Sequence, residues 1–121
     1  MKKVLIIEDD KIIKGIIEFI LKKEGFVTEF AFDGLTGIEK LSTFAPDIVI
    51  TDVMLPYKSG IEIIQASKQL NPDVPVIVIS ALGKEDSTVQ DAFKHGANDI
   101  LAKPFNPGEL TQKLKTILQL A

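Results

Sequence analysis

Apolar residues gather along the chain in five short runs, which are separated by longer amphipathic stretches. The runs are rich in Val and Ile and have the length of β-strands. We therefore predict strands over Val4–Ile7, Val27–Ala31, Ile48–Thr51, Val76–Ile79 and Ile100–Ala102. The run that begins at Ile48 is apolar at successive positions, which is typical of a strand that is covered on both faces.

The stretches between these strands carry apolar residues at helical spacing, such as Leu35, Ile38 and Leu41 before Pro46. Residues that commonly cap helices stand near the expected helix ends. The predicted N-terminal caps are Asp10, Ser59 in a Ser59-x-x-Glu62 capping box, Ser87 in a Ser87-x-x-Gln90 box, and Asn106 before Pro107. Gly25 and Gly96 are predicted to close the first and fourth helices.

Strand and helix alternate five times, which predicts a parallel sheet with helices on both faces. Right-handed crossovers leave few topologies for such a chain. We expect the strand order 2-1-3-4-5 of a flavodoxin-like (βα)5 fold, in which ligands bind at the carboxyl ends of the first and third strands. The 121 residues suit one domain spanning 1–121.

Composition narrows the class of protein. The chain is 45% hydrophobic and 26% charged, and it has no cysteine for a disulfide or a thiolate metal site. Its net charge of -3 leaves no basic stripe for direct nucleic-acid binding. The first apolar run is too short for a signal peptide, and no segment approaches the roughly 20 apolar residues that span a bilayer. We expect a cytoplasmic protein that does not bind membranes.

Polar residues stand where four of the five predicted strands end. Glu8 and Asp9 follow the first strand, Asp52 the third, Ser80 the fourth and Lys103 the fifth. Carboxyl ends of parallel strands share one edge, so the three carboxylates are expected to converge there and to raise one another's pKa. A hard divalent cation such as Mg²⁺ relieves this repulsion, because it prefers oxygen ligands.

These residue types suit phosphoryl transfer. Asp52 is a candidate nucleophile that would form an aspartyl phosphate. A bound cation would neutralise charge on the transferring group, and Lys103 would add a point charge. The Ser80 hydroxyl can donate a hydrogen bond to a phosphate oxygen.

The chain resembles the receiver domain of two-component response regulators over nearly its whole length. The resemblance rests on "VLIIEDD", "IVITDVMLPYKSG", "VPVIVISA" and "GANDILAKPF", in this order and spacing. It implies a phosphoacceptor switch that takes a phosphoryl group from a phosphohistidine, not a turnover enzyme. The implied donor is a sensor histidine kinase or a histidine phosphotransfer protein. An output domain or target protein, and a phosphorylation-dependent homodimer through the fourth helix, fifth strand and fifth helix, are implied as well.

The resemblance also implies a role for each site residue. Asp52 matches the phosphoacceptor, Ser80 the switch hydroxyl and Lys103 the phosphate-binding lysine. The implied ligands of Mg²⁺, or of Mn²⁺ in its place, are Glu8, Asp9, Asp52 and the backbone carbonyl of Met54. A cis peptide bond between Lys103 and Pro104 is implied too. Ile100 departs from the family pattern, which usually has Tyr or Phe three residues before the lysine.

Three alternative functions would use parts of the same sequence pattern. Phosphohydrolases with an aspartate nucleophile carry a second Asp two residues later as general acid and base; Met54 stands there, so a phosphate on Asp52 should persist. A receiver-like interaction module that is never phosphorylated remains an alternative. A flavodoxin-like cofactor carrier would need a phosphate-binding loop after the first strand, where Glu8, Asp9 and Asp10 would repel the phosphate.

Overall fold

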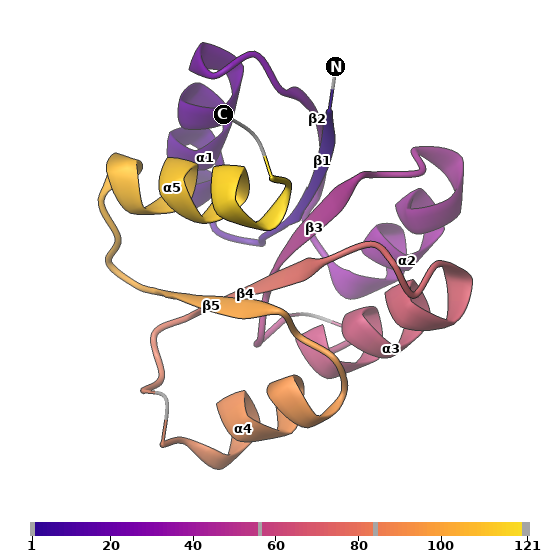
Figure 1. The fold of residues 1–121 in the computed structure, drawn as a ribbon. Coiled ribbons are helices and arrows are strands. Elements are labelled where there is room, and N and C mark those ends of the chain that lie inside the picture. The colour runs from indigo at the N-terminus through magenta and orange to yellow at the C-terminus, as the bar shows by residue number, and fades with distance from the viewer. Residues whose placement is uncertain (1, 56, 84, 120–121) are drawn as a thin grey trace.

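The computed structural model describes residues 2–55, 57–83 and 85–119, so Pro56 of the motif around Asp52 lies outside the described residues. Five strands alternate with five helices in these residues (Figure 1). The strands are β1 (Lys3–Ile7), β2 (Val27–Ala31), β3 (Ile48–Asp52), β4 (Val76–Ser80) and β5 (Asp99–Ala102), and the helices are α1 (Lys11–Lys23), α2 (Gly34–Thr43), α3 (Gly60–Leu70), α4 (Ser87–Lys94) and α5 (Pro107–Ile117). Every strand bound lies within one residue of its prediction.

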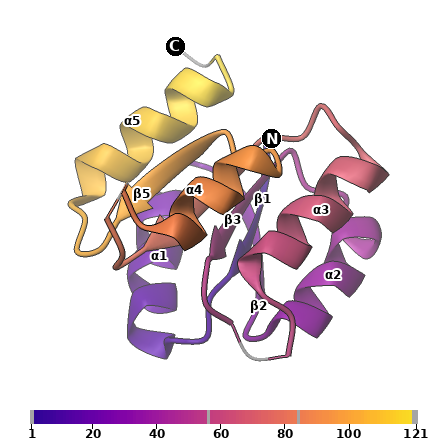
Figure 2. The ribbon, with the colours of Figure 1, turned by 90° about the horizontal axis from the view of Figure 1, so that it is seen from below.

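The strands form one parallel sheet in the order β2-β1-β3-β4-β5, which confirms the predicted topology. Helices α1 and α5 cover one face of this sheet, and α2, α3 and α4 cover the other (Figures 1 and 2). No helix in the described ranges is both long and apolar enough to cross a membrane.

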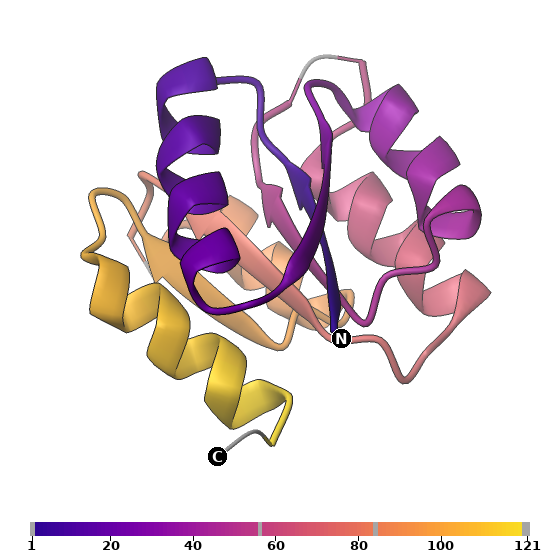
Figure 3. The same cartoon turned by 90° about the horizontal axis from the view of Figure 1, so that it is seen from above.

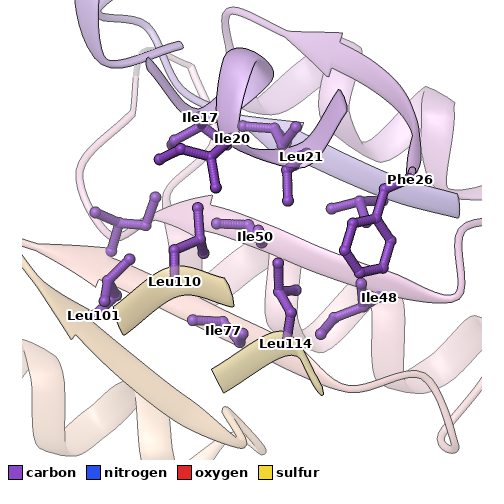
Figure 4. Packing of buried hydrophobic residues seen from close by; sticks show 13 residues of the cluster. Ile17, Ile20, Leu21, Phe26, Ile48, Ile50, Ile77, Leu101, Leu110 and Leu114 are labelled. Carbon is purple, nitrogen blue, oxygen red and sulfur yellow. The ribbon is translucent and has the colours of Figure 1, made fainter. Parts of the chain in front are cut away.

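Each face of the sheet has its own apolar core, because alternate residues of a strand point to opposite faces. In β3, Ile48 and Ile50 pack in the cluster beneath α1 and α5, while Val49 packs in the cluster beneath the other three helices. Leu110 and Leu114 of α5 meet these isoleucines in the first cluster (Figure 4). Burial on both sides explains why the predicted strands are apolar at successive positions.

Side-chain caps fix the start of each helix. The Asp10 carboxylate accepts a hydrogen bond from the Ile12 N–H at 2.9 Å, and the predicted Ser59 capping box is complete. The predicted Ser87 box is wrong, because Asp86 caps α4 by accepting from the Thr88 N–H at 2.8 Å. Both Asp and Ser cap helices well, but the Asp carboxylate also carries a negative charge that the positive end of the helix dipole favours.

Gly25 and Gly96 follow α1 and α4 at positive φ angles of 86° and 115°, as predicted for helix ends. A third glycine, Gly60, lets α3 begin directly against the end of β3. A Cβ atom at this position would lie 2.5 Å from the Asp52 carbonyl oxygen. The close approach therefore holds the β3–α3 connection, which carries Met54, at the edge of the sheet.

Candidate functional site

The carboxyl ends of the strands lie together at one edge of the sheet, at the top of Figure 3, while both ends of the chain lie at the opposite edge. Strands β1 and β3 are direct neighbours whose register pairs Ile7 with Thr51. The next residues along the chain, Glu8 and Asp52, therefore reach this edge side by side. Strand order thus creates the meeting of acidic residues that the sequence predicts.

Three carboxylates form one cluster there. One oxygen of each of Glu8, Asp9 and Asp52 lies within 4.8 Å of the others. Glu8 is 1% exposed and Asp52 is 7% exposed, whereas Asp9 is exposed to solvent. The cluster therefore has a buried floor and one side that solvent can reach.

Lys103, which follows β5, supplies the positive charge of this cluster. Its Nζ donates a hydrogen bond to Asp52 Oδ2 at 2.6 Å and lies 2.9 Å from Glu8 Oε1. Partial burial acts to lower the pKa of the ammonium, but the two carboxylates outweigh it and raise the pKa of Lys103 above its ordinary value. Lys103 therefore remains a cation that bridges the ends of three strands.

Glu8 is a buried carboxyl of the cluster whose pKa is raised. Its Oε1 is buried and has no hydrogen-bond donor among the described residues, since Lys103 Nζ is an ionic neighbour without hydrogen-bond geometry. Its Oε2 accepts from the Asp10 N–H at 3.2 Å. Burial, aided by the nearby Asp52 charge and opposed by Lys103 and the Asp10 N–H, raises the pKa of Glu8 to about 7.

The Glu8 carboxylate provides a test of whether the site suits a divalent cation. Its buried Oε1 has Lys103 Nζ at 2.9 Å as an ionic neighbour but no hydrogen bond of good geometry among the described residues, so it keeps lone pairs for a metal ion. Two more carboxylates lie within reach, and one of them is open to solvent. The donor set, which consists of oxygens only, therefore fits Mg²⁺ or Mn²⁺.

Met54 and Ser80 lie at the margin of the cluster. The Met54 N–H donates to Asp52 Oδ1 at 3.1 Å, which holds the backbone after β3 against the nucleophile candidate. Ser80 is fully buried at the end of β4, and its Oγ accepts from the Leu82 N–H at 2.9 Å. The Ser80 hydroxyl is thus engaged with the start of the β4–α4 loop.

The fifth strand contributes two more features. The Lys103 N–H donates to the Ser80 carbonyl at 2.8 Å, so the ends of β4 and β5 are tied together. The peptide bond between Lys103 and Pro104 is cis, as predicted. Ile100, in place of the expected aromatic residue, is 5% exposed.

Two parts of this site were not predicted from the sequence. Glu8 was expected among the metal ligands but not as a partner of Lys103, and no role was expected for Gly60. The ion pair depends on the reach of the Lys103 side chain from the end of β5 to the ends of β1 and β3, which no local pattern encodes. For Gly60, the only available signal is its position directly after the capping Ser59.

These features define a class of protein: a doubly wound, parallel α/β domain with an acidic edge that fits a divalent cation and a lysine paired to a buried aspartate. The chain belongs to the response regulator receiver domain family, whose model matches residues 4–115. It is therefore a domain of two-component signalling, and its acidic site fits Mg²⁺ and an aspartyl phosphate.

Individual relatives agree with this assignment. The chain is 32% identical over 120 residues to the phosphate regulon transcriptional regulatory protein PhoB of Escherichia coli K12, covering 98% of this chain and 52% of the relative. A CheY-like receiver domain protein from Methanospirillum hungatei JF-1 superposes with a TM-score of 0.93 at 27% identity, covering 98% and 94% of the two chains. The BeF3-activated DrrB receiver domain superposes with a TM-score of 0.89 at 33% identity, covering 98% of each chain. The chain spans about half the length of the curated relatives that it matches.

Proposed function

We propose that this chain is a phosphoacceptor switch in which Asp52 takes a phosphoryl group from a phosphohistidine. The observation that supports this most directly is the pairing of Asp52 with Lys103 at 2.6 Å inside the cluster of carboxylates. A buried aspartate that an ammonium and a backbone N–H hold in position is a carboxylate placed to attack phosphorus. In the transfer, an Asp52 oxygen forms the new bond to phosphorus as the bond to the imidazole nitrogen breaks, and the imidazole leaves with that electron pair.

Glu8, Asp9, Asp52 and the Met54 carbonyl would hold a divalent cation, Mg²⁺ or Mn²⁺. When bound, the cation supplies charge neutralisation for the phosphoryl oxygens. The Met54 N–H orients Asp52 from one side, and Lys103 orients it from the other. After transfer, the Lys103 ammonium pairs with a phosphoryl oxygen in place of the Asp52 carboxylate.

Ser80 would convert this local change into a movement. A phosphorylated Asp52 carries more negative charge and strong acceptors, to which the Ser80 hydroxyl, which now accepts from the Leu82 N–H, would donate. Rotation of the hydroxyl toward the phosphate would release that bond and free the start of the β4–α4 loop. Ile100 is already packed inside, so the change rests on this loop and on α4.

The proposed donor is a sensor histidine kinase or a histidine phosphotransfer protein, and the proposed recipient is an output domain or a target protein. A phosphorylation-dependent homodimer would form through α4, β5 and α5. We place these events in the cytoplasm, where such donors present their phosphohistidine. Met54 offers no general base to water, so this chain would store the phosphoryl group and not turn it over.

The proposal is tested by intact mass after incubation with Mg²⁺ and acetyl phosphate. One added phosphoryl group is expected, and Asp52→Asn should abolish it. EDTA should also prevent the addition. Undiminished labelling of the Asn variant would refute the choice of nucleophile, and labelling in EDTA would refute the role of the cation. A chain that shows no labelling under any of these conditions, while folded and bound to Mg²⁺, would be the unphosphorylated interaction module.

A further inference from the structure

A cavity of about 510 Å³ opens at the amino edge of the sheet, opposite the acidic cluster. The carboxyl-terminal ends of α2 and α3 and the connections that lead into β3 and β4 form its walls. Its volume falls in the range of roughly 300–1,000 Å³ that is typical of small-molecule sites. It shares no residue with the cluster around Asp52.

The cavity has an apolar wall that can hold a hydrocarbon body. Leu41 of α2 is 4% exposed and lies at its floor, whereas Leu70 at the end of α3 is 57% exposed. Val74, which is half-buried, completes this wall. Covering Leu70 would remove apolar surface from water, which favours an amphipathic occupant.

Ser67 adds a polar group to the cavity. This residue of α3 is 3% exposed and lines the space, and its hydroxyl makes no hydrogen bond to another residue in the described part of the chain. The hydroxyl is therefore available to a guest in the cavity.

The charged side chains that line the cavity are negative. Asp47 and Asp73 line it, and its lining among the described residues includes no Lys, Arg or His side chain. The ends of α2 and α3 that face it carry the negative poles of their dipoles. Two ammonium groups keep their positive charge nearby but lie outside the lining: Lys3 Nζ donates to the Phe44 carbonyl at 2.7 Å and Lys68 Nζ to the Val74 carbonyl at 2.9 Å. Asp47 Oδ2 accepts from the Lys3 N–H at 2.8 Å, which leaves Oδ1 for a guest.

We propose that this cavity binds a small organic cation with an apolar body, such as an alkylammonium or an amidinium. Its charged head lies between Asp47 and Asp73, its apolar part covers Leu70 and Leu41, and it donates a hydrogen bond to Ser67. Binding at this site involves no residue of the phosphoacceptor proposal, so either can fail without the other.

The test uses the ¹⁵N-labelled chain and three ligands of one shape: cyclohexylammonium, cyclohexanol and cyclohexanecarboxylate. Amide shifts should move in residues 41–47 and 67–74 with the cation, at millimolar affinity. The cation should bind roughly tenfold more tightly than the carboxylate, because two carboxylates attract one and repel the other. Equal binding of the three ligands, shifts that centre elsewhere, or no saturable shift with the cation would overturn the proposal.

Two variants locate the site. Asp73→Asn removes one charge from an exposed loop, and Ser67→Ala removes the hydroxyl with little change in volume. Each substitution should lower the affinity for the cation severalfold. Glu39→Gln, an exposed change elsewhere on α2, should leave its affinity unchanged. If Asp73→Asn binds the cation as tightly as the wild type, or if Glu39→Gln weakens it equally, the assignment to this cavity is wrong. The dispersion of amide shifts in each spectrum shows that each variant is folded.

Discussion

Replacing Glu8 by Gln should stabilise the cation-free protein while removing most of its response to Mg²⁺. The carboxyl is buried, one of its oxygens has no hydrogen-bond donor among the described residues, and its pKa is raised from 4.5 to about 7. The neutral amide has the same shape without the cost of a buried charge. Lys103 does not lose its only partner, because its hydrogen bond to Asp52 remains.

The size of the effect follows from linkage. A shift from 4.5 to about 7 corresponds to at most about 3.5 kcal/mol, at about 1.4 kcal/mol for each pKa unit. Because the folded state holds this proton more tightly than the unfolded state, the stability that the proton provides is complete below pH 4.5 and is lost as pH rises through about 7. We expect the Gln variant to be about 1–3 kcal/mol more stable near pH 8, with the difference vanishing toward acid pH.

Urea unfolding at a series of pH values, with EDTA or with Mg²⁺, measures this effect. A gain of 2 kcal/mol raises the urea midpoint by roughly 1 M. Mg²⁺ should raise the midpoint of the wild type by mass action and that of the Gln variant much less. Glu39→Gln, which changes an exposed carboxylate on α2, is the control that should behave as the wild type. A Gln variant that is less stable than the wild type near pH 8 in EDTA would show that the ion pair with Lys103 outweighs the cost of burial.

Four further substitutions, with Gly15→Ala as a control, probe the backbone, the Lys103 cation and the switch. Gly60→Ala should cost about 1–3 kcal/mol in urea unfolding, since its Cβ would lie 2.5 Å from the Asp52 carbonyl oxygen; Gly15→Ala, where nothing lies within 4 Å, should instead stabilise α1. The Lys103→Ala variant should still accept phosphate from acetyl phosphate, but more slowly and with weakened partner binding. Normal phosphorylation and normal partner binding would show that Lys103 has no role in the switch. Ser80→Ala should accept phosphate yet lose most of the NMR shift changes around α4 and β5 that BeF3 or phosphate induces, and the full set of changes would refute its role. Ile100→Ala should lower the free energy of unfolding by about 2–4 kcal/mol, because the side chain is buried. It should keep those shift changes, because the side chain has no polar group that could respond to the phosphate.

Most of the fold could be predicted from the sequence because its signals are local. The strands are short apolar runs, and Asp10, Ser59 and Asn106 are side chains that cap their own helices. The start of α4 was missed because two neighbouring residues, Asp86 and Ser87, compete for one role. Sequence spacing alone cannot settle which of them has the extended backbone of a cap.

The site divides in the same way. Glu8, Asp9, Asp52 and Lys103 could be placed at one edge, since strand order brings the strand ends together. Burial could not be predicted: Glu8 is enclosed and Asp9, its neighbour in sequence, is exposed. The burial that raises the pKa of Glu8 comes from the packing of the strand ends, which sequence spacing does not give.

The two apolar clusters described for the sheet have no residue in common. Substitutions beneath α1 and α5 can therefore be compensated among themselves, without repacking the side chains beneath α2, α3 and α4. Where positions in the two clusters are more than about 7–10 Å apart, their energetic effects usually add. During evolution, substitutions on one side of the sheet can therefore adapt that surface to a new partner. The side chains and the binding surface on the other side can stay unchanged.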